Sequence, residues 1–169
     1  MQDNITNLLV AACGNVMASD DAFGPLVARE LRRINPMGID VIDLDIRPAA
    51  LLDHLAGRPS LILLDAVHAP GMEPGLVLDI DWFSEARPEL IHDDTMSTHG
   101  LSIATQLELA GRLGLLPPVV SLIGFTLRDR PVVDHPVSHG LARCVVDAAQ
   151  LAIQHIDRAP GYAKERRHA

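Results

Sequence analysis

The stretch that decides the fold is NLLVAACGNVMASDDAFG, residues 7–24. It starts with a continuous apolar run that ends at Gly14, and such a run is typical of a strand covered on both faces in a parallel sheet. Two adjacent carboxylates, Asp20 and Asp21, follow within a short loop. Because neighbouring carboxylates repel each other, the pattern indicates that they either lie in water or meet a cation.

The apolar pattern along the rest of the chain alternates between strand-like and helix-like segments. Further strands are predicted at 39–45, 60–67, 75–82 and 118–125, and helices at 25–35, 50–57, 100–113 and from Val137 to Ile156. The strand at 75–82 has a mixed second face, which predicts a place near a sheet edge, and 83–99 reads as an irregular loop. Strands that alternate with helices predict an α/β fold, a three-layer α/β/α sandwich with a twisted, mostly parallel five-stranded sheet.

Composition limits the classes of protein that the chain can belong to. With 169 residues, 48% of them hydrophobic, we expect a single domain over 1–158 and a flexible basic tail over 159–169. A net charge of -8 and few aromatic residues disfavour nucleic acid as a partner. No apolar run approaches the roughly 18 residues that span a bilayer, and MQDNITN lacks the basic start of a secretory signal. The expected protein is cytoplasmic and binds neither nucleic acid nor membrane.

The two cysteines, Cys13 and Cys144, are far apart in the sequence and form no C-x-x-C motif. They therefore indicate neither a zinc knuckle nor a redox pair, and each is expected to be a small buried residue.

Several polar residues are expected to meet at one edge of the sheet, because working groups in such folds gather at the carboxyl ends of the strands. Asp20 and Asp21 follow the first strand, Asp65 ends the strand at 60–67, and His99 precedes the helix at 100–113. Carboxylate oxygens and one imidazole nitrogen can bind a divalent cation such as nickel, zinc or manganese. Among the other histidines, only His68 is close enough to Asp65 in sequence to join such a site.

Structural explanations exist for the same residues. Asp20 or Asp21 could cap the following helix, where free N–H groups favour a carboxylate. Asp65 could form a turn, and His99 could be a capping or core residue. A further alternative is a metal-free structural domain with solvated aspartates.

Three other functional classes use related patterns. A receiver domain also has an acidic pair and an aspartate that ends the third strand, but it needs a lysine at the last strand, and the only lysine here is Lys164 in the tail. A dinucleotide site is not indicated, because G-x-G-x-x-G is absent and the carboxylates would repel a pyrophosphate. A serine hydrolase is not indicated either, because G-x-S-x-G is absent.

Four segments of the chain form a joint pattern: GNVMASDDAFGPLVARELRR, LILLDAVHAPGMEPG, STHGLSIATQLELAGRLG and LIGF. Together they resemble the maturation endopeptidases of nickel-iron hydrogenases, and the resemblance covers roughly residues 7–156. The family shows a G-N-x-x-x-x-D-[DE]-x-x-G loop, a strand ending in D-A with a following P-G, and a single His that opens a helix. The resemblance implies a twisted sheet between helix layers. It also implies an enzyme that removes a short C-terminal extension from the hydrogenase large-subunit precursor after nickel insertion.

The resemblance further implies roles for three residues. Asp21, Asp65 and His99 match the positions that engage the nickel of the substrate and form the catalytic set. A water would attack the scissile carbonyl with metal or carboxylate assistance. The nickel is carried by the substrate, and zinc or cadmium could substitute for it in the isolated protein.

The chain departs from the family pattern at three places. Ala12 and Cys13 stand where the family usually has G-x before Gly14, DLDIRPAALL lacks the glycines of the usual D-G-G-T loop, and the proline expected soon after LIGF is delayed to Pro131. These departures fit a divergent member that serves an unusual hydrogenase, and they also fit a paralogue that acts on another protein. A separate alternative is a non-catalytic maturation chaperone that binds a metal-loaded partner protein without cutting it.

Overall fold

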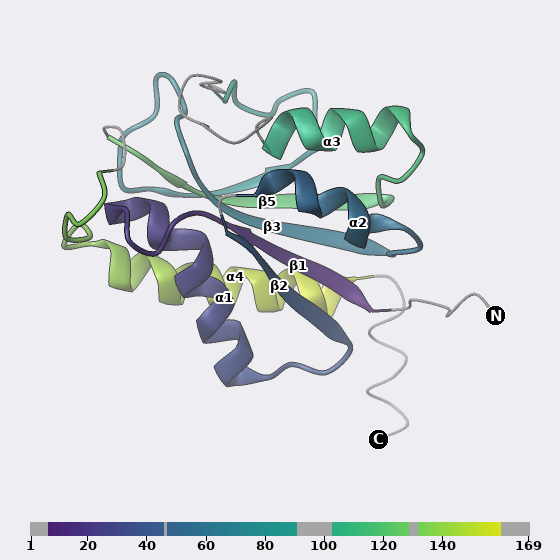
Figure 1. The fold of residues 1–169 in the computed structure, drawn as a ribbon, viewed down its shortest axis with the longest axis horizontal. Helices are drawn as coiled ribbons and strands as arrows, with labels where there is room; N and C mark the ends of the chain where they lie inside the picture. The colour runs from purple at the N-terminus through teal and green to yellow at the C-terminus, as the bar shows by residue number, and fades with distance from the viewer. Residues whose placement is uncertain (1–6, 46, 91–102, 129–131, 160–169) are drawn as a thin grey trace.

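The sheet of this protein contains five strands in the order β2-β1-β3-β5-β4. The computed structural model describes residues 7–45, 47–90, 103–128 and 132–159 (Figure 1). The strands are β1 (Leu8–Cys13), β2 (Ile39–Asp45), β3 (Ser60–Val67), β4 (Val77–Asp81) and β5 (Val119–Thr126). Only β4 runs antiparallel to its neighbour. The mostly parallel sheet predicted from the sequence is confirmed, with β4 at an edge.

Helices cover both faces of the sheet and complete the three layers. Figure 1 shows α1 (Phe23–Ile34) and α4 (Leu141–Arg158) on one face, and α2 (Leu52–Leu55) and α3 (Ile103–Arg112) on the other. Two short 3-10 turns, η1 (Ser19–Ala22) and η2 (Pro48–Leu51), precede α1 and α2. The sandwich has one apolar core on each face of the sheet.

Strand β1 is apolar throughout because both of its faces are covered. Leu9, Ala11 and Cys13 belong to the core beneath α3, whereas Val10 and Ala12 belong to the core beneath α1 and α4. Side chains alternate across a strand, so a strand in the middle layer needs apolar residues at every position. All six residues of β1 are buried.

Helix α1 begins at Phe23 rather than at Pro25, the predicted start. The turn η1 leads directly into the helix, and Pro25 lies in its first turn, where a backbone N–H has no helical partner to lose. The helix ends at Asn35, whose φ of 52° is left-handed and whose N–H donates to the carbonyl of Leu31.

The last helix begins later than predicted. It was expected from Val137, but α4 starts at Leu141, and Val137 is 46% exposed. The expectation was wrong because the segment before Gly140 bonds to the loop after β1 instead of continuing the helix; the N–H of Ser138 donates to Asp20.

Three smaller expectations also changed. The helix predicted at 50–57 is reduced to α2 after a 3-10 turn. Leu76, predicted to lie in the strand at 75–82, is outside β4 and is 45% exposed. Cys13 is buried as expected, but Cys144 is only partly buried. The helix predicted at 100–113 is α3 within the described residues.

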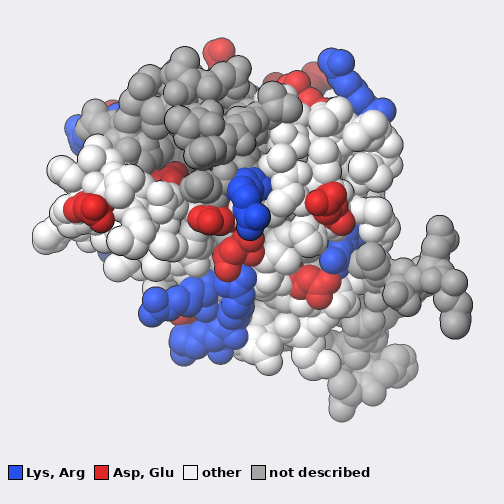
Figure 2. Space-filling view, in the orientation of Figure 1, with Lys and Arg blue, Asp and Glu red and all other residues white. Residues whose placement is uncertain are grey.

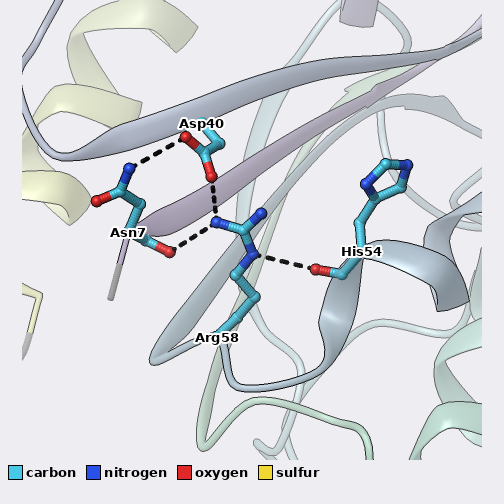
Figure 3. A network of polar contacts seen from close by, with 4 residues as sticks. All are labelled: Asn7, Asp40, His54 and Arg58. Carbon is cyan, nitrogen blue, oxygen red and sulfur yellow. Dashed lines mark hydrogen bonds and ion pairs between the residues drawn. The ribbon is translucent and has the colours of Figure 1, made fainter. Parts of the chain in front are cut away.

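A polar network closes the amino end of the sheet, opposite to the strand ends that carry the aspartates. The Arg58 side chain is 8% exposed and pairs with the carboxylate of Asp40 (Figure 3). It also donates to the carbonyls of Asn7 at 3.2 Å and His54 at 3.1 Å. One guanidinium therefore joins the residues that enter β1, β2 and β3.

The sequence predicts a flexible basic tail over residues 159–169. Ala159 is buried, and the rest of the tail predicted over 159–169 lies outside the described residues. Within the residues that the structure describes, none of the helices has the length and apolarity that a membrane crossing requires.

Candidate functional site

Asp21 lies in the turn η1, directly after β1. Its carboxylate Oδ2 accepts a hydrogen bond of 2.7 Å from the backbone N–H of Asn15, at the start of the same loop. Asn15 is itself held by an Asx turn, because its Oδ1 accepts from the N–H of Met17 at 2.9 Å. Burial raises the pKa of Asp21, and the Asn15 N–H offsets part of the increase. The loop therefore holds Asp21 in a partly buried position.

Asp65 lies near the carboxyl end of β3. Burial raises the pKa of Asp65 to about 8; the charge of Asp21 adds to the increase, and the N–H of Ala66, which donates to Oδ1 at 2.9 Å, opposes it. The turn η1, which holds Asp21, contacts β3, which holds Asp65, and the charge of Asp21 acts on Asp65. Two distant segments thus bring the predicted aspartates to one edge of the sheet.

Cys13 is a third group near these carboxylates. Its thiol is buried, and its pKa is raised well above the usual range by burial and then by the charges of Asp65 and Asp21. The register pairs Ala12 with Leu64, so Cys13 and Asp65 are the next residues along β1 and β3. On the other side of Asp65, the partner residue in β5 is Gly124, so no side chain from that strand stands beside the carboxylate.

Asp20 has a different environment from Asp21. Its Oδ1 accepts the backbone N–H of Ser138 at 2.6 Å, in the segment before α4. Neither aspartate makes a side-chain hydrogen bond that caps η1 or α1. The helix-capping explanation is therefore wrong for both, and each carboxylate accepts a hydrogen bond from a different backbone N–H.

Two glycines allow the backbone around these residues to pack closely. At Gly24 a Cβ would lie 2.2 Å from the carbonyl oxygen of Cys13 and 2.5 Å from that of Leu64, so the first turn of α1 sits directly on the ends of β1 and β3. At Gly14 the φ is +128°, and a Cβ would lie 2.0 Å from the carbonyl oxygen of Asp21. Ala12, by contrast, is a buried residue of β1, and the register of β1 with β2 shifts between Ala12 and Cys13. The turn at Gly14 forms although the family glycine is missing at position 12.

His99 lies outside the described residues. The helix that follows it, α3, packs on the face of the sheet to which Cys13, Leu63 and Val67 also belong. His68 is described and partly buried beyond β3. Among the described residues, however, no group of three or more His, Cys, Asp or Glu side chains is arranged to hold a metal ion. The structure therefore brings together Asp21 and Asp65, and it does not bring His68 to them as a third ligand.

Sequence reasoning missed the placement of Cys13 and the role of Asn15. The sequence predicts only that Cys13 is a small buried residue, because its proximity to Asp65 depends on the register between β1 and β3. The contact from Asn15 to Asp21 uses the backbone N–H, so the side chain of Asn15 gave no signal for it.

The fold and the edge of the sheet define an α/β protein with two electrostatically coupled carboxylates at adjacent strand ends. The family model for hydrogenase maturation proteases, HycI, matches residues 25–155. The chain belongs to this family, and it is a peptidase of the hydrogenase maturation class.

Individual relatives agree with this assignment. The chain is 30% identical over 158 residues to the hydrogenase expression/formation protein HupD of Bradyrhizobium diazoefficiens, covering 90% of this chain and 78% of the relative. It is 29% identical over 119 residues to the hydrogenase 2 maturation protease of Escherichia coli, covering 69% and 71%. Among solved structures, the hydrogenase maturating endopeptidase HybD from E. coli superposes with a TM-score of 0.69 at 19% identity, covering 89% of this chain and 91% of that one. This last match supports the fold.

Proposed function

We propose that this protein is an endopeptidase that removes the C-terminal extension of a nickel-iron hydrogenase large-subunit precursor after nickel has been inserted. Membership of the maturation protease family supports the reaction class. The observation that carries the metal-dependent part is the pair Asp21 and Asp65, whose burial and mutual repulsion disfavour the ionised forms. A cation brought by the substrate would relieve that repulsion.

In this proposal Asp21, Asp65 and His99 engage the nickel of the precursor. Nickel belongs to the substrate, and it fixes the nearby scissile bond against the strand ends. A water attacks the carbonyl with assistance from the metal or from a carboxylate, which as a general base accepts the proton that the water loses. Asp65, whose pKa is about 8 without a metal, would release its own proton when it binds the cation.

The requirement for nickel in the precursor would act as a checkpoint before cleavage. A precursor without the metal offers the three ligands nothing to bind, so it would remain uncut. The aspartic-type mechanism, the nickel dependence and a cytoplasmic location are parts of this proposal.

The test is intact-mass analysis of a large-subunit precursor incubated with the protein, with and without nickel. We expect loss of a C-terminal peptide only from the nickel-loaded precursor. Asp21→Asn is expected to slow processing by about a hundredfold or more, as for loss of a catalytic group. Asp81→Asn is the matched control, because Asp81 ends β4 at the opposite edge of the sheet.

Two results would contradict the proposal in different ways. A stable complex with the nickel-loaded precursor and no mass change would indicate a chaperone that binds without cutting. Equal processing by wild type and Asp21→Asn would refute the assigned role of Asp21.

A further inference from the structure

Among the side chains that the structure describes, two buried polar atoms have no hydrogen-bond partner: the hydroxyl oxygen of Ser60 and the side-chain carbonyl oxygen of Gln106, Oε1. Both residues are 2% exposed. A buried acceptor without a donor destabilises the native state, and native proteins contain few of them. Where a protein keeps such a group, stability is often given up in favour of function.

Gln106 lies in the half of α3 that is nearer to the candidate site. Helix α3 leads into β5, which begins at the amino edge of the sheet, so the helix runs from the carboxyl edge back to the amino edge (Figure 1). Gln106 is the fourth residue of α3 (Ile103–Arg112). The turn η2, which follows β2 at the carboxyl edge, contacts α3. Gln106 therefore lies toward the edge that carries the two aspartates.

Asp65 and Gln106 are on the same side of the sheet. The residues two positions before and after Asp65, Leu63 and Val67, belong to the core beneath α3, and side chains alternate across a strand. Asp65 thus lies on the face of β3 that α3 covers. Leu107, the neighbour of Gln106, belongs to the same core. The unpaired carbonyl is therefore in the layer of the sandwich that Asp65 faces.

The surroundings of Gln106 favour an uncharged hydrogen-bond donor. The other buried residues of α3 are apolar, and its two charged residues, Glu108 and Arg112, are exposed. Figure 2 shows a mostly uncharged surface where α3 lies in Figure 1. A charged donor would lose its hydration in such surroundings at a high cost, whereas an uncharged N–H costs far less. A peptide backbone offers one N–H at every residue except proline.

We propose that Gln106 is a specificity-determining residue of the peptidase, and that its side-chain carbonyl accepts a backbone N–H from the segment of the precursor that binds at the carboxyl edge. The inference rests on the proposed function, since it names a contact of the same substrate. The glutamine side chain has three rotatable bonds, so the carbonyl can turn to a donor that reaches this edge. In the free protein the acceptor stays unpaired, and the bound precursor satisfies it.

The test compares thermal stability and processing kinetics in three variants. Gln106→Met keeps the length of the side chain but removes the carbonyl, so Tm is expected to rise by about 2–4 °C. With the nickel-loaded precursor, the same variant should raise KM by about fivefold and preserve kcat, because it loses one hydrogen bond to the substrate.

Two matched controls separate stability from substrate binding. Ser60→Ala removes the other unpaired oxygen, which lies at the amino start of β3, and is expected to raise Tm without changing KM. Gln154→Met, at an exposed position of α4, should change neither quantity.

Failure of this inference can be separated from failure of the proposed function. Unchanged KM in Gln106→Met, or an equal increase in Ser60→Ala, would overturn the role of Gln106 while cleavage by the wild type stands. A lower Tm in Gln106→Met would also overturn it, since the carbonyl would then be satisfied in the free protein.

If the wild type does not cut the precursor, fluorescence anisotropy with the labelled nickel-loaded precursor decides the contact alone. Binding that Gln106→Met weakens about fivefold, and that Ser60→Ala leaves unchanged, would support the contact. Equal binding by wild type and Gln106→Met, or no binding to the wild type, would overturn it.

Discussion

Asp21 and Asp65, which come from different segments of the chain, interact through their carboxylates at the carboxyl edge of the sheet. Burial raises the pKa of Asp65 to about 8, and the charge of Asp21 contributes to that increase. In the native state Asp65 therefore keeps its proton up to about pH 8. In the unfolded chain the carboxyl has an ordinary pKa near 4 and loses its proton at lower pH.

This interaction predicts that stability falls as pH rises. Between the unfolded pKa and about 8 the native state binds more protons at Asp65 than the unfolded state does, so the free energy of unfolding decreases with increasing pH in that window. Asp65→Asn should remove this contribution and raise Tm at pH 8 by about 3 °C or more, with a smaller effect at pH 5. Thermal unfolding at both pH values measures it. An equal change in Tm at pH 5 and pH 8 would contradict the raised pKa.

Gly24 and Gly111 should respond to alanine with opposite signs. Gly24→Ala places a Cβ against the carbonyls of Cys13 and Leu64 and is expected to destabilise the protein by about 2 kcal/mol or more, because two backbone segments must move. Gly111→Ala, inside α3 with only Leu116 near its Cβ, should stabilise by about 0.5–1 kcal/mol. Urea unfolding of both variants gives the comparison. A neutral Gly24→Ala would mean that α1 does not sit on the strand ends.

Arg58→Met should destabilise the protein without affecting the chemistry of the site. The substitution removes the Arg58 donor from the carbonyls of Asn7 and His54 and from the Asp40 carboxylate, which keeps only the bond from the Asn7 side-chain amide, at a cost of about 1–3 kcal/mol. Arg143→Met is a suitable control, since that side chain is 88% exposed and its carboxylate contact is 3.9 Å long. Denaturant midpoints, together with precursor processing rates per folded molecule, test both parts. Loss of processing in folded Arg58→Met would show that the amino edge also serves the reaction.

The network at Arg58 also gives a pH dependence of the opposite sign to that of Asp65. The hydrogen bond from Arg58 lowers the pKa of Asp40 below its usual range. The ion pair therefore stabilises the native state at pH values above the pKa of Asp40 in the unfolded chain, and this stabilisation is lost as the pH falls through the pKa of Asp40 in the native state. Arg58→Met should therefore cost less stability at pH 3 than at pH 7. Equal losses at the two pH values would argue that packing, rather than the ion pair, carries the effect of Arg58.

The two thiols should differ in accessibility to alkylation. Cys13 is buried in the core beneath α3, near the carboxylates of Asp21 and Asp65. Cys144 is only partly buried on α4, and its pKa is raised by burial and then by the charge of Asp147. Iodoacetamide at pH 8 should modify Cys144 slowly and leave Cys13 unmodified until the protein is denatured. Peptide mass mapping detects each product, and Cys144→Ser should take up no label in the native state. Labelling of native Cys13 would show that solvent reaches the end of β1.

Residue patterns alone determined the layers of this protein. The apolar β1 and the largely apolar β3 predicted strands covered on both faces, and the mixed face of the segment at 75–82 predicted an edge strand. Burial on one or on two faces produces a hydrophobic period that can be read from the sequence without tertiary detail. The place of Asp21 and Asp65 at one edge was likewise predictable, since parallel strands end together. His99, the third expected ligand, stays a prediction.

Only the tertiary structure decided how these carboxylates are held and what surrounds them. The late start of α4, the bond from Ser138 to Asp20 and the joining of Met17 to Asp134 depend on contacts across more than a hundred residues, which no local period records. The proximity of Cys13 to Asp65 depends on the register between β1 and β3. The close packing of Gly24 depends on how near the backbone of α1 comes to the ends of these strands. Local propensity sets which elements form, whereas the packing of distant segments sets the charge, burial and accessible surface of the site.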